Sequence, residues 1–509
     1  MNQTHAPRGR APLLTGSAKD VKACHGPAVY QQPGHALSSG LMELRQYVIK
    51  GLGHLSALLA DDSAGLAAVI DPRRDVDLYL QEAAGLGLRI THVVETHLHN
   101  DYVSGARELA SLTGARHVIG AGAELGYEHK GLRHGEDFDV GALRFHALDT
   151  PGHTPEHVSY AVADRSRTDE PLLLFTGGSL LVGAVGRTDL LGADMAEPYA
   201  RQMFASLHDQ LLPHDDFVAV LPTHGGGSLC SKDIATTPRS TIGYERRHNG
   251  LLAVAEIEQF VRLLLEGQPS FPRYFARMRP INQAGPGPLG VISPPVPLSA
   301  EEAGDLLSGD ALAVDLRSYA EFAQAHVPGA LSIPAGSSFG TWLGWIVPHD
   351  QPLVLVLNGI EQWDDALRQS LRIGHENVRG YLQGGMPGWL DEGRPVEFSA
   401  AATVHQLRQS LDGHRPGGRD GPLVLDVRQR DEYERGHVPG ALHILAGDLP
   451  ERLAELPRDR PIVTMCSAGY RSAVAAGLLR RAGFGDVTSI AGGLPAWRAA
   501  GYPVENASG

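Results

Sequence analysis

The sequence predicts an α/β protein of several domains, and three observations lead to that prediction. Apolar strands alternate with helical segments from about residue 42 to 265, as where LAAVIDP (66–72) precedes VDLYLQEAAGLGL (76–88). A stretch rich in Pro and Gly (266–297) then predicts a linker. Beyond the linker, one module of roughly 100 residues occurs twice, and such internal repeats define the architecture of a chain.

The repeat is visible in the amino-acid sequence. VDLRSYAEFAQAHVPGALSIP (314–334) matches LDVRQRDEYERGHVPGALHIL (425–445), and GGMPGW (384–389) matches GGLPAW (492–497). Each copy alternates strand and helix, which predicts a mostly parallel sheet with helices on both faces. We therefore divide the chain into a disordered tail (1–40), a first domain (41–265), a linker (266–297) and two modules (298–398 and 403–505).

The composition excludes several classes of function. The formal net charge of −14 provides no electrostatic footprint for nucleic acid or an anionic membrane. No run approaches the ~18–20 apolar residues of a membrane span, and the first residues lack the apolar core of a secretory signal. Three cysteines form no disulfide framework and favour a reducing compartment, so we expect a cytoplasmic enzyme acting on small molecules. The sequence leaves a homodimer open.

Cys466 is the strongest candidate for a catalytic residue. It stands between an apolar strand and a helix in RPIVTMCSAGYRSAVAAGLLRRAG (460–483). Backbone N–H groups of such a loop, together with the helix N-terminus, stabilise an anion and favour a thiolate that can carry sulfur. We expect Arg471 to add a positive charge at the rim. The predicted cradle consists of Ser467, Ala468, Gly469, Tyr470 and Ser472.

The whole C-terminal module resembles the rhodanese family, in which a loop of the type Cys-x-x-Gly-x-Arg carries a cysteine persulfide. LDVRQRDEYERGHVPGA, CSAGYRS and GGLPAW carry the resemblance, and His437 is then a structural residue. In the middle module Asn358 falls at the position of Cys466, and Glu361, Asp364 and Asp365 make the loop acidic. An amide cannot carry sulfur, so we expect this copy to be catalytically silent.

Histidines follow several strands of the first domain. His97, His99 and Asp101 lie in ETHLHNDYVSG, His153 lies in DTPGHTPEHVSY, and His224 lies in LPTHGGG. A single histidine is more often structural than a ligand. Several at the ends of strands on one sheet edge predict a metal site.

Residues 42–265 resemble the metallo-β-lactamase superfamily, and TPGHTPEHVSY and FTGGSLLVGAVGRTDLLG are most similar to its persulfide dioxygenases. That resemblance implies an αββα sandwich followed by two rhodanese-like α/β domains with mostly parallel sheets. The related enzymes carry one iron ion and oxidise a persulfide with dioxygen to sulfite. This sequence departs from the motif twice: Tyr102 replaces its last histidine, and Gly178 replaces a metal-binding aspartate.

The resemblance and the retained residues predict one metal ion, iron(II) in preference to zinc, held by His97, His99 and His153. Asp101 and His224 alone are too few for a second ion. Asp189 could act near the site, although a structural cap is the preferred interpretation.

The leading hypothesis is an enzyme of sulfur metabolism. A persulfide dioxygenase-like metal domain is coupled to a Cys466 sulfurtransferase, and both use a small thiol or persulfide such as glutathione persulfide. In one alternative the metal domain hydrolyses a thioester, as glyoxalase II-like relatives do. In the other the metal domain is degenerate and only Cys466 is active.

Overall fold

Two six-stranded sheets packed face to face form the N-terminal domain of the computed structural model, which describes residues 42–292, 294–418 and 420–506. The predicted tail, residues 1–40, lies outside the described residues. The first sheet contains, in spatial order, β1 (Met42–Ile49), β2 (His54–Asp61), β3 (Leu66–Ile70), β4 (Arg89–Val94), β5 (Arg116–Gly120) and β6 (Lys130–Leu132). The second contains β12 (Ser240–Thr241), β11 (Ala219–Pro222), β10 (Leu173–Gly177), β9 (Val158–Asp164), β8 (Leu143–Asp149) and β7 (Asp137–Val140).

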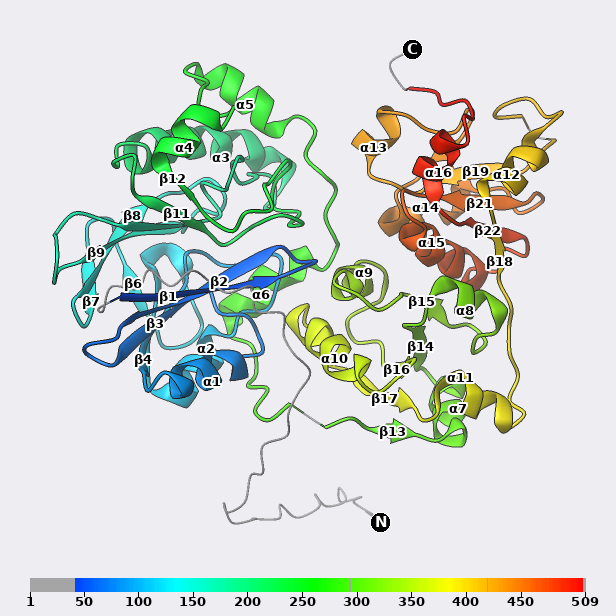
Figure 1. Cartoon of the computed structure of the whole chain (residues 1–509), viewed down its shortest axis with the longest axis horizontal. Helices are drawn as coiled ribbons and strands as arrows, with labels where there is room; N and C mark the ends of the chain where they lie inside the picture. Colours follow the sequence, from blue (N-terminus) through cyan, green and yellow to red (C-terminus); the bar gives the residue numbers. More distant parts are fainter. Residues whose placement is uncertain (1–41, 293, 419, 507–509) are drawn as a thin grey trace, which may run out of the picture. The chain divides into compact units, whose positions relative to one another are not determined.

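Helices cover the outer face of each sheet. They are α1 (Asp77–Gly85) and α2 (Ala106–Thr113) on the first sheet, and α3 (Ala193–Ala205), α4 (Ile242–His248) and α5 (Ile257–Leu265) on the second (Figure 1). This is the predicted αββα sandwich.

The strands of this domain are apolar on both faces because both faces are buried. Successive side chains of a strand point to opposite sides of its sheet. Leu59 and Phe175 therefore pack in the core between the sheets, whereas their neighbours Leu58 and Leu174 pack beneath the outer helices. This double burial explains why the strands appear in the sequence as continuous apolar runs rather than as alternating ones.

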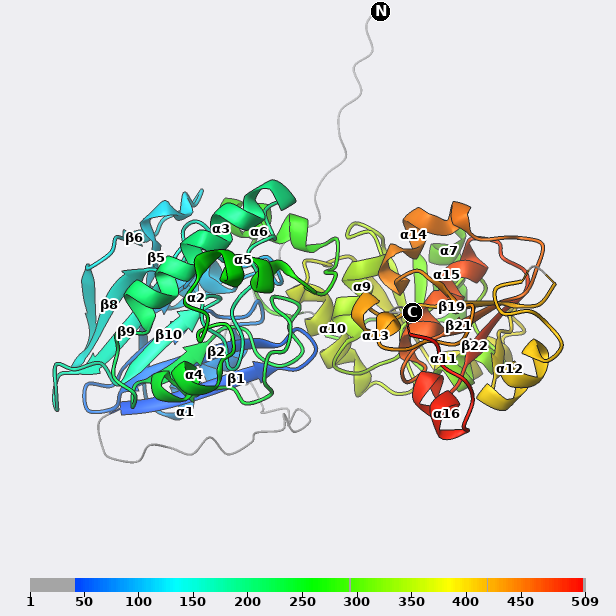
Figure 2. The ribbon, with the colours of Figure 1, turned by 90° about the horizontal axis from the view of Figure 1, so that it is seen from above.

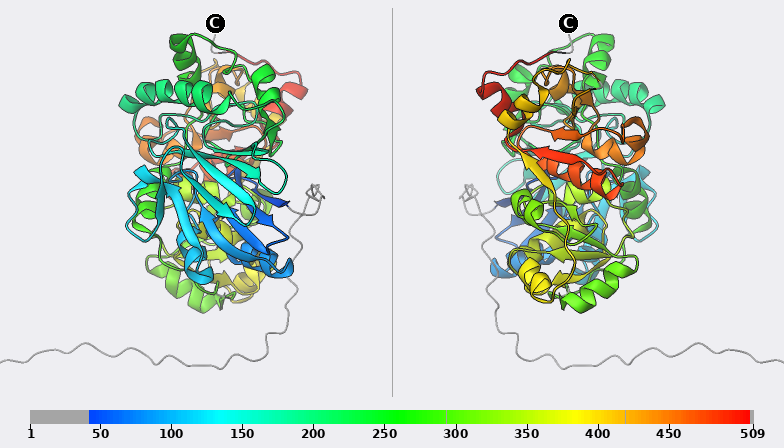
Figure 3. Two further views of the ribbon diagram at one scale, coloured as in Figure 1. Left: turned by 90° about the vertical axis from the view of Figure 1, so that its left-hand side faces the viewer. Right: turned by 90° about the vertical axis from the view of Figure 1, so that its right-hand side faces the viewer.

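The two modules of the repeat each contain a five-stranded sheet whose pairings are all parallel. The middle module contains β13 (Pro297–Leu298), α7 (Ala300–Ser308), β14 (Leu312–Asp315), α8 (Tyr319–Gln324), β15 (Leu331–Ser332), α9 (Phe339–Ile346), β16 (Leu353–Val356), α10 (Gln362–Arg372), β17 (Val378–Leu382) and α11 (Gly385–Asp391). The C-terminal module contains β18 (Ala400–Ala402), α12 (Val404–Leu411), β19 (Leu423–Asp426), α13 (Arg430–Glu434), β20 (Leu442–His443), α14 (Leu449–Arg452), β21 (Ile462–Met465), α15 (Tyr470–Arg481), β22 (Val487–Ile490) and α16 (Gly493–Ala499). Figures 2 and 3 show helices on both sides of these sheets. No helix of the described residues is long and apolar enough to cross a membrane.

Both modules are stabilised by the same buried ion pair. Arg317 pairs with Asp315 at the end of β14, and Arg428 pairs with Asp426 at the end of β19, each with an Nη2–Oδ2 distance of 2.6 Å. The repeated letters VDLR and LDVR thus encode one structural device. It is retained in the copy without a nucleophile because it stabilises the fold rather than the chemistry.

The segment expected to be a linker contains a helix, α6 (Phe275–Ala284), that belongs to the N-terminal domain. Its buried residues Phe275, Met278 and Asn282 are spaced by three and four positions and therefore share one face. The side-chain amide of Asn282 donates to the backbone carbonyl oxygens of His99 and Tyr102, both at 2.9 Å. The helix therefore holds the predicted metal-binding loop from outside. Because this helix buries only a few side chains, its apolar pattern is weak, and the prolines and glycines of the segment suggested a linker instead.

The middle module also contacts the N-terminal domain, and both belong to one compact unit. Arg372 of α10 donates to both carboxylate oxygens of buried Asp75 at 2.7 Å, and Arg368 donates to Asp77 at 2.7 and 2.8 Å. Burial raises the pKa of Asp75, but the positive charges of Arg372, Arg73 and Arg368 outweigh burial and lower this pKa to about 2. These ion pairs attach the middle module to the N-terminal domain.

The attachment of α6 can be tested by removing one charge. Arg279 donates to the two oxygens of Glu156 at 3.0 and 2.7 Å, and the Glu156 side chain is only 1% exposed. Replacing Arg279 with Met leaves a buried carboxylate without its partner, so we expect a loss of about 3 kcal/mol in the stability of this domain. The free energy of unfolding is measured from the first unfolding transition in urea. Arg201→Met is the matched control, because Arg201 makes a bidentate pair with Glu258 on the surface. Equal shifts for both variants would contradict a supporting role for α6.

Candidate metal centre and sulfur-transfer site

Three buried imidazoles converge at one edge of the sandwich. His97 follows β4, His153 lies in the turn between β8 and β9, and His224 follows β11. Each is at most 1% exposed. One ligand atom of each lies within 4.8 Å of the others, which is the arrangement a metal ion requires.

Hydrogen bonds orient two of these rings so that Nε2 faces the cluster. The Thr96 hydroxyl donates its hydrogen to Asp71. It therefore accepts a hydrogen bond from Nδ1–H of His97, at 2.9 Å. The Nδ1–H of His153 donates to the carbonyl oxygen of Arg187 at 2.8 Å. Partners of this kind set the tautomer of a ligating histidine and leave the other nitrogen free to bind metal.

The protonation state also suits a metal. Burial, followed by the nearby imidazoles, holds the pKa of His97 well below its usual range and lowers the pKa of His153 to about 3. Both rings are therefore neutral at pH 7, the form that binds a metal.

The spacing of the nitrogens fits as well. Nε2 of His224 lies 3.4 Å from Nε2 of His97. Two imidazoles on a tetrahedral ion with metal–nitrogen bonds of ~2.1 Å place their nitrogens about 3.4 Å apart. These residues therefore fit a transition metal held by a three-histidine face.

The second site lies in the C-terminal module, where Cys466 follows β21 and precedes α15. Gly469, at φ +100°, turns the loop so that its N–H points at the sulfur, 3.0 Å away. Ser472 places its Oγ 3.6 Å from the same sulfur. A negative sulfur at this position is stabilised by the N–H group and by the N-terminus of a 12-residue helix.

Arg471 does not provide the free positive charge that we expected. Its guanidinium pairs with both carboxylate oxygens of Glu432, and it also donates to Ser467 Oγ at 2.9 Å. Burial raises the pKa of Glu432, but Arg471 outweighs burial and lowers it to about 2, so the ion pair is intact at neutral pH. Arg471 therefore braces the loop as part of a neutral pair.

The remaining cradle residues have different environments. Ala468 is exposed, whereas Tyr470 donates its hydroxyl to the carbonyl oxygen of Pro334 in the middle module at 3.1 Å. His437 donates Nδ1–H to the Tyr433 carbonyl oxygen at 3.0 Å, consistent with a structural role.

In the middle module Asn358 donates its amide to Glu321, the counterpart of Glu432, at 3.2 Å. The module therefore retains the glutamate of the loop while lacking its nucleophile.

Comparisons with known proteins agree with this architecture. The metallo-beta-lactamase superfamily model matches residues 50–224, and the rhodanese-like domain model matches residues 299–392 and 403–500. A solved structure of a metallo-beta-lactamase from Staphylococcus aureus subsp. aureus COL is 31% identical, with a TM-score of 0.61, and the match covers 67% of this chain and 98% of that one. The mitochondrial persulfide dioxygenase ETHE1 of Homo sapiens is 30% identical over 217 residues, which are 41% of this chain and 74% of that protein. A sulfurtransferase of Allochromatium vinosum is 36% identical over 101 residues, 20% of this chain and 94% of that protein.

The chain belongs to the metallo-beta-lactamase superfamily. Its N-terminal domain is ETHE1-like and is followed by two rhodanese-like domains, so the predicted fusion is confirmed.

Within the metallo-beta-lactamase domain, the three clustered histidines differ from the predicted set. His224 joins His97 and His153, whereas His99 belongs to a second group with Asp101 and His224 and has Nε2 3.3 Å from Asp71 Oδ1. Its ring stacks on Tyr102 at 4.5 Å. The aspartate and the tyrosine thus both contact the His99 ring, which lies 4.3 Å from the His97 ring.

Asp101 belongs to a second group of potential ligands, with His99 and His224. Its carboxylate is buried and lies 3.3 Å from His224 Nδ1. Burial raises the pKa of Asp101, but His224 outweighs it and lowers this pKa to about 2. A neutral imidazole has one lone pair for a metal. His224 can therefore serve only one of the two groups at a time, and binding through Nε2 leaves its Nδ1–H for Asp101.

Asp189 has the structural role that we preferred. It pairs with Arg187 at 2.6 and 2.8 Å, and Arg187 also donates to the carbonyl oxygens of Leu229 and Pro269. Asp189 holds Arg187 in place, and the Arg187 carbonyl oxygen orients His153. Asp189 therefore supports the cluster indirectly.

Sequence reasoning missed several residues that complete the two sites. Asp71 binds Thr96 through two hydrogen bonds, and its position at the end of an apolar strand was a usable signal. Burial lowers the pKa of His224, but buried Cys230 and Asp101 outweigh burial and raise this pKa well above its usual range. Glu432 recurs as Glu321 in the other repeat, which was a second usable signal.

Gly178 replaces the metal-binding aspartate of the motif, and the space beside it is occupied by another side chain. A Cβ atom on Gly178 would lie 2.2 Å from Cδ2 and 2.7 Å from Nε2 of His153. Gly178→Asp should therefore displace His153 and lower the metal content. The metal-to-protein ratio of purified variants tests this. Gly250→Asp is the control, since nothing lies within 4 Å of its Cβ position. A higher ratio in Gly178→Asp would instead show that His153 moves aside.

Proposed function

We propose that the chain is an enzyme of sulfur metabolism, in which metal-dependent oxidation of a persulfide is coupled to sulfane-sulfur transfer at Cys466. The observation that carries the proposal is the buried cluster of His97, His153 and His224 in an ETHE1-like domain, joined to a thiol at a helix N-terminus. The metal is one iron(II) ion. The small thiol is a carrier such as glutathione, and the compartment is the cytoplasm.

The metal domain contributes a prepared binding face. His97, His153 and His224 would hold the ion, while Thr96 and the Arg187 carbonyl keep two of the rings in the ligating tautomer. When bound, iron(II) would supply the redox chemistry for oxidation of a terminal sulfur by dioxygen. Burial of the histidines keeps bulk water from competing for their nitrogens.

The rhodanese-like module contributes the transfer step. The Cys466 thiolate attacks the terminal sulfur of a persulfide R–S–SH, a new sulfur–sulfur bond forms, and the old bond breaks with its electron pair leaving as R–S⁻. The product is the Cys466 persulfide, and no external oxidant is needed. Gly469 N–H stabilises the charge on the attacking sulfur.

The role of Cys466 is tested by Cys466→Ser. A hydroxyl at this position is too weak a nucleophile, so we expect thiosulfate:cyanide sulfur transfer to fall at least about a thousandfold with the fold unchanged. Asn358→Ala in the middle module is the matched control and should leave transfer unaltered. Transfer that survives in Cys466→Ser would exclude this residue, and a large loss in folded Asn358→Ala would show that the middle module does more than support.

The metal is tested by elemental analysis combined with an oxygen electrode. We expect one iron per chain, oxygen consumption with glutathione persulfide, and a larger loss of iron in His224→Ala than in His99→Ala, because His224 belongs to the cluster. Zinc without oxygen consumption would favour the thioester hydrolase. Two tightly bound ions would contradict the argument from the single lone pair of His224. A protein that binds no metal and consumes no oxygen even with added iron would favour a degenerate metal domain.

A further inference from the structure

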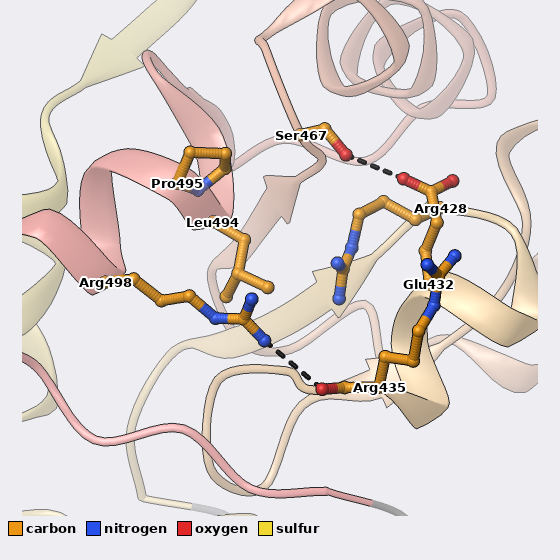
Figure 4. Close-up of a pocket in the computed structure, with 7 residues that line it drawn as sticks. All are labelled: Arg428, Glu432, Arg435, Ser467, Leu494, Pro495 and Arg498. Atoms are coloured by element: carbon orange, nitrogen blue, oxygen red, sulfur yellow. Dashed lines mark hydrogen bonds between the residues drawn. The ribbon is translucent and has the colours of Figure 1, made fainter.

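A pocket opens beside the loop that carries Cys466. Its volume is about 260 Å³, and it is lined by Arg428, Glu432, Arg435, Ser467, Leu494, Pro495 and Arg498. Figure 4 shows the guanidinium groups of Arg428 and Arg498 pointing into the same space, with Ser467 across from them. Ser467 directly follows the nucleophile in sequence, so the pocket adjoins the site of transfer.

The lining carries more positive than negative charge. Glu432 is neutralised by Arg471, as described above. Arg498 donates Nη2 to the carbonyl oxygen of Arg435 at 3.2 Å, and no carboxylate of the described residues pairs with it. Its charge is therefore available to a ligand.

Arg428 adds a second donor to this pocket. Asp426 and the Gly436 carbonyl oxygen accept from its Nε and Nη2 atoms at 2.6 to 3.0 Å. Within the described parts of the chain, Nη1 makes no hydrogen bond to protein. Two guanidinium groups thus offer unused N–H donors to one space, an arrangement that recognises an oxyanion such as a carboxylate.

A backbone hydrogen bond connects the helix that carries Arg498 to Cys466. Leu494 donates its backbone N–H to the Cys466 carbonyl oxygen at 2.8 Å, and Arg498 follows four residues later on α16. Four helical residues rise by about 6 Å. Arg498 therefore lies about one helical turn along α16 from the residue that binds the Cys466 backbone.

The volume agrees with an organic ligand. A space of about 260 Å³ equals the volume of roughly nine water molecules at ~30 Å³ each, which exceeds the need of a small inorganic anion. The volume therefore favours a persulfide built on an organic thiol.

We propose that Arg498, with Arg428, binds a carboxylate of the thiol carrier whose persulfide reacts with Cys466. The pocket is thus a specificity site that selects carboxylate-bearing persulfides, such as glutathione persulfide, over neutral ones. This inference rests on the proposed transfer reaction and adds the chemical class of its substrate. The transfer itself proceeds as written above, and the carboxylate stays on the departing thiolate.

The test compares two donors with the full-length protein. One is glutathione persulfide and the other is the persulfide of glutathione diethyl ester, in which both carboxylates are masked. In the wild type we expect the KM for the ester to be about tenfold higher, because a charge-assisted pair contributes on the order of a tenfold change in affinity. Arg498→Gln should raise the KM for the acid about tenfold, leave kcat within about twofold, and leave the ester unaffected.

Arg430→Gln is the matched control. Arg430 lies on α13 of the same module, pairs with Glu434 on the surface and does not line the pocket, so its removal changes the net charge by the same amount. The control should retain the preference for the acid. Thiosulfate serves as a short inorganic donor, and its KM should not change in Arg498→Gln.

Three outcomes separate the hypotheses. If the acid is preferred equally in wild type and in folded Arg498→Gln, the specificity site is wrong while the transfer function stands. If Arg498→Gln raises the KM for thiosulfate as much as for the acid, the pocket attracts anions in general and the proposal is overturned. If the wild type transfers sulfur from none of the three donors, the proposed function fails and this inference with it.

Discussion

The carboxylate of Asp71 joins the ends of three strands, and the metal centre depends on this connection. Asp71 follows β3 and accepts hydrogen bonds from the backbone and the hydroxyl of Thr96, after β4, and from the hydroxyl of Thr223, after β11. Because β3 and β4 belong to one sheet and β11 to the other, a single buried side chain ties the two layers together. Its backbone has φ +49°, a conformation that costs a non-glycine residue about 1 kcal/mol and is offset here by these hydrogen bonds.

Sequence neighbours carry this connection to the metal ligands. His97 follows Thr96 and His224 follows Thr223, so both threonines that bind Asp71 precede a histidine of the cluster. The third ligand, His153, is fixed independently through the carbonyl oxygen of Arg187. The cluster is thus prepared by polar contacts outside it, and its own nitrogens remain free for a metal.

The two rhodanese-like modules separate the requirements of fold from those of chemistry. Both retain the Asp–Arg pair at the end of a strand and a glutamate that binds the active-site loop. Only one retains the thiol and the Gly469 N–H that faces it. The silent copy contributes contacts instead, to Asp75 of the metal domain and to Tyr470 of the persulfide loop.

The sequence by itself determined the fold classes and the repeat, and it indicated Cys466 as the candidate nucleophile. These follow from local signals: buried strands appear as apolar runs, a duplicated module repeats its letters, and a cysteine between strand and helix needs no distant partner to be recognised. Tertiary structure decided the rest. It brought His224 together with His97 and His153, placed His99 with Asp101 and His224 in a second group, and filled the space beside Gly178 with His153. It also neutralised Arg471 with Glu432, 39 residues earlier in the chain. Each of these outcomes depends on contacts between segments far apart in sequence, and packing alone establishes which of them form.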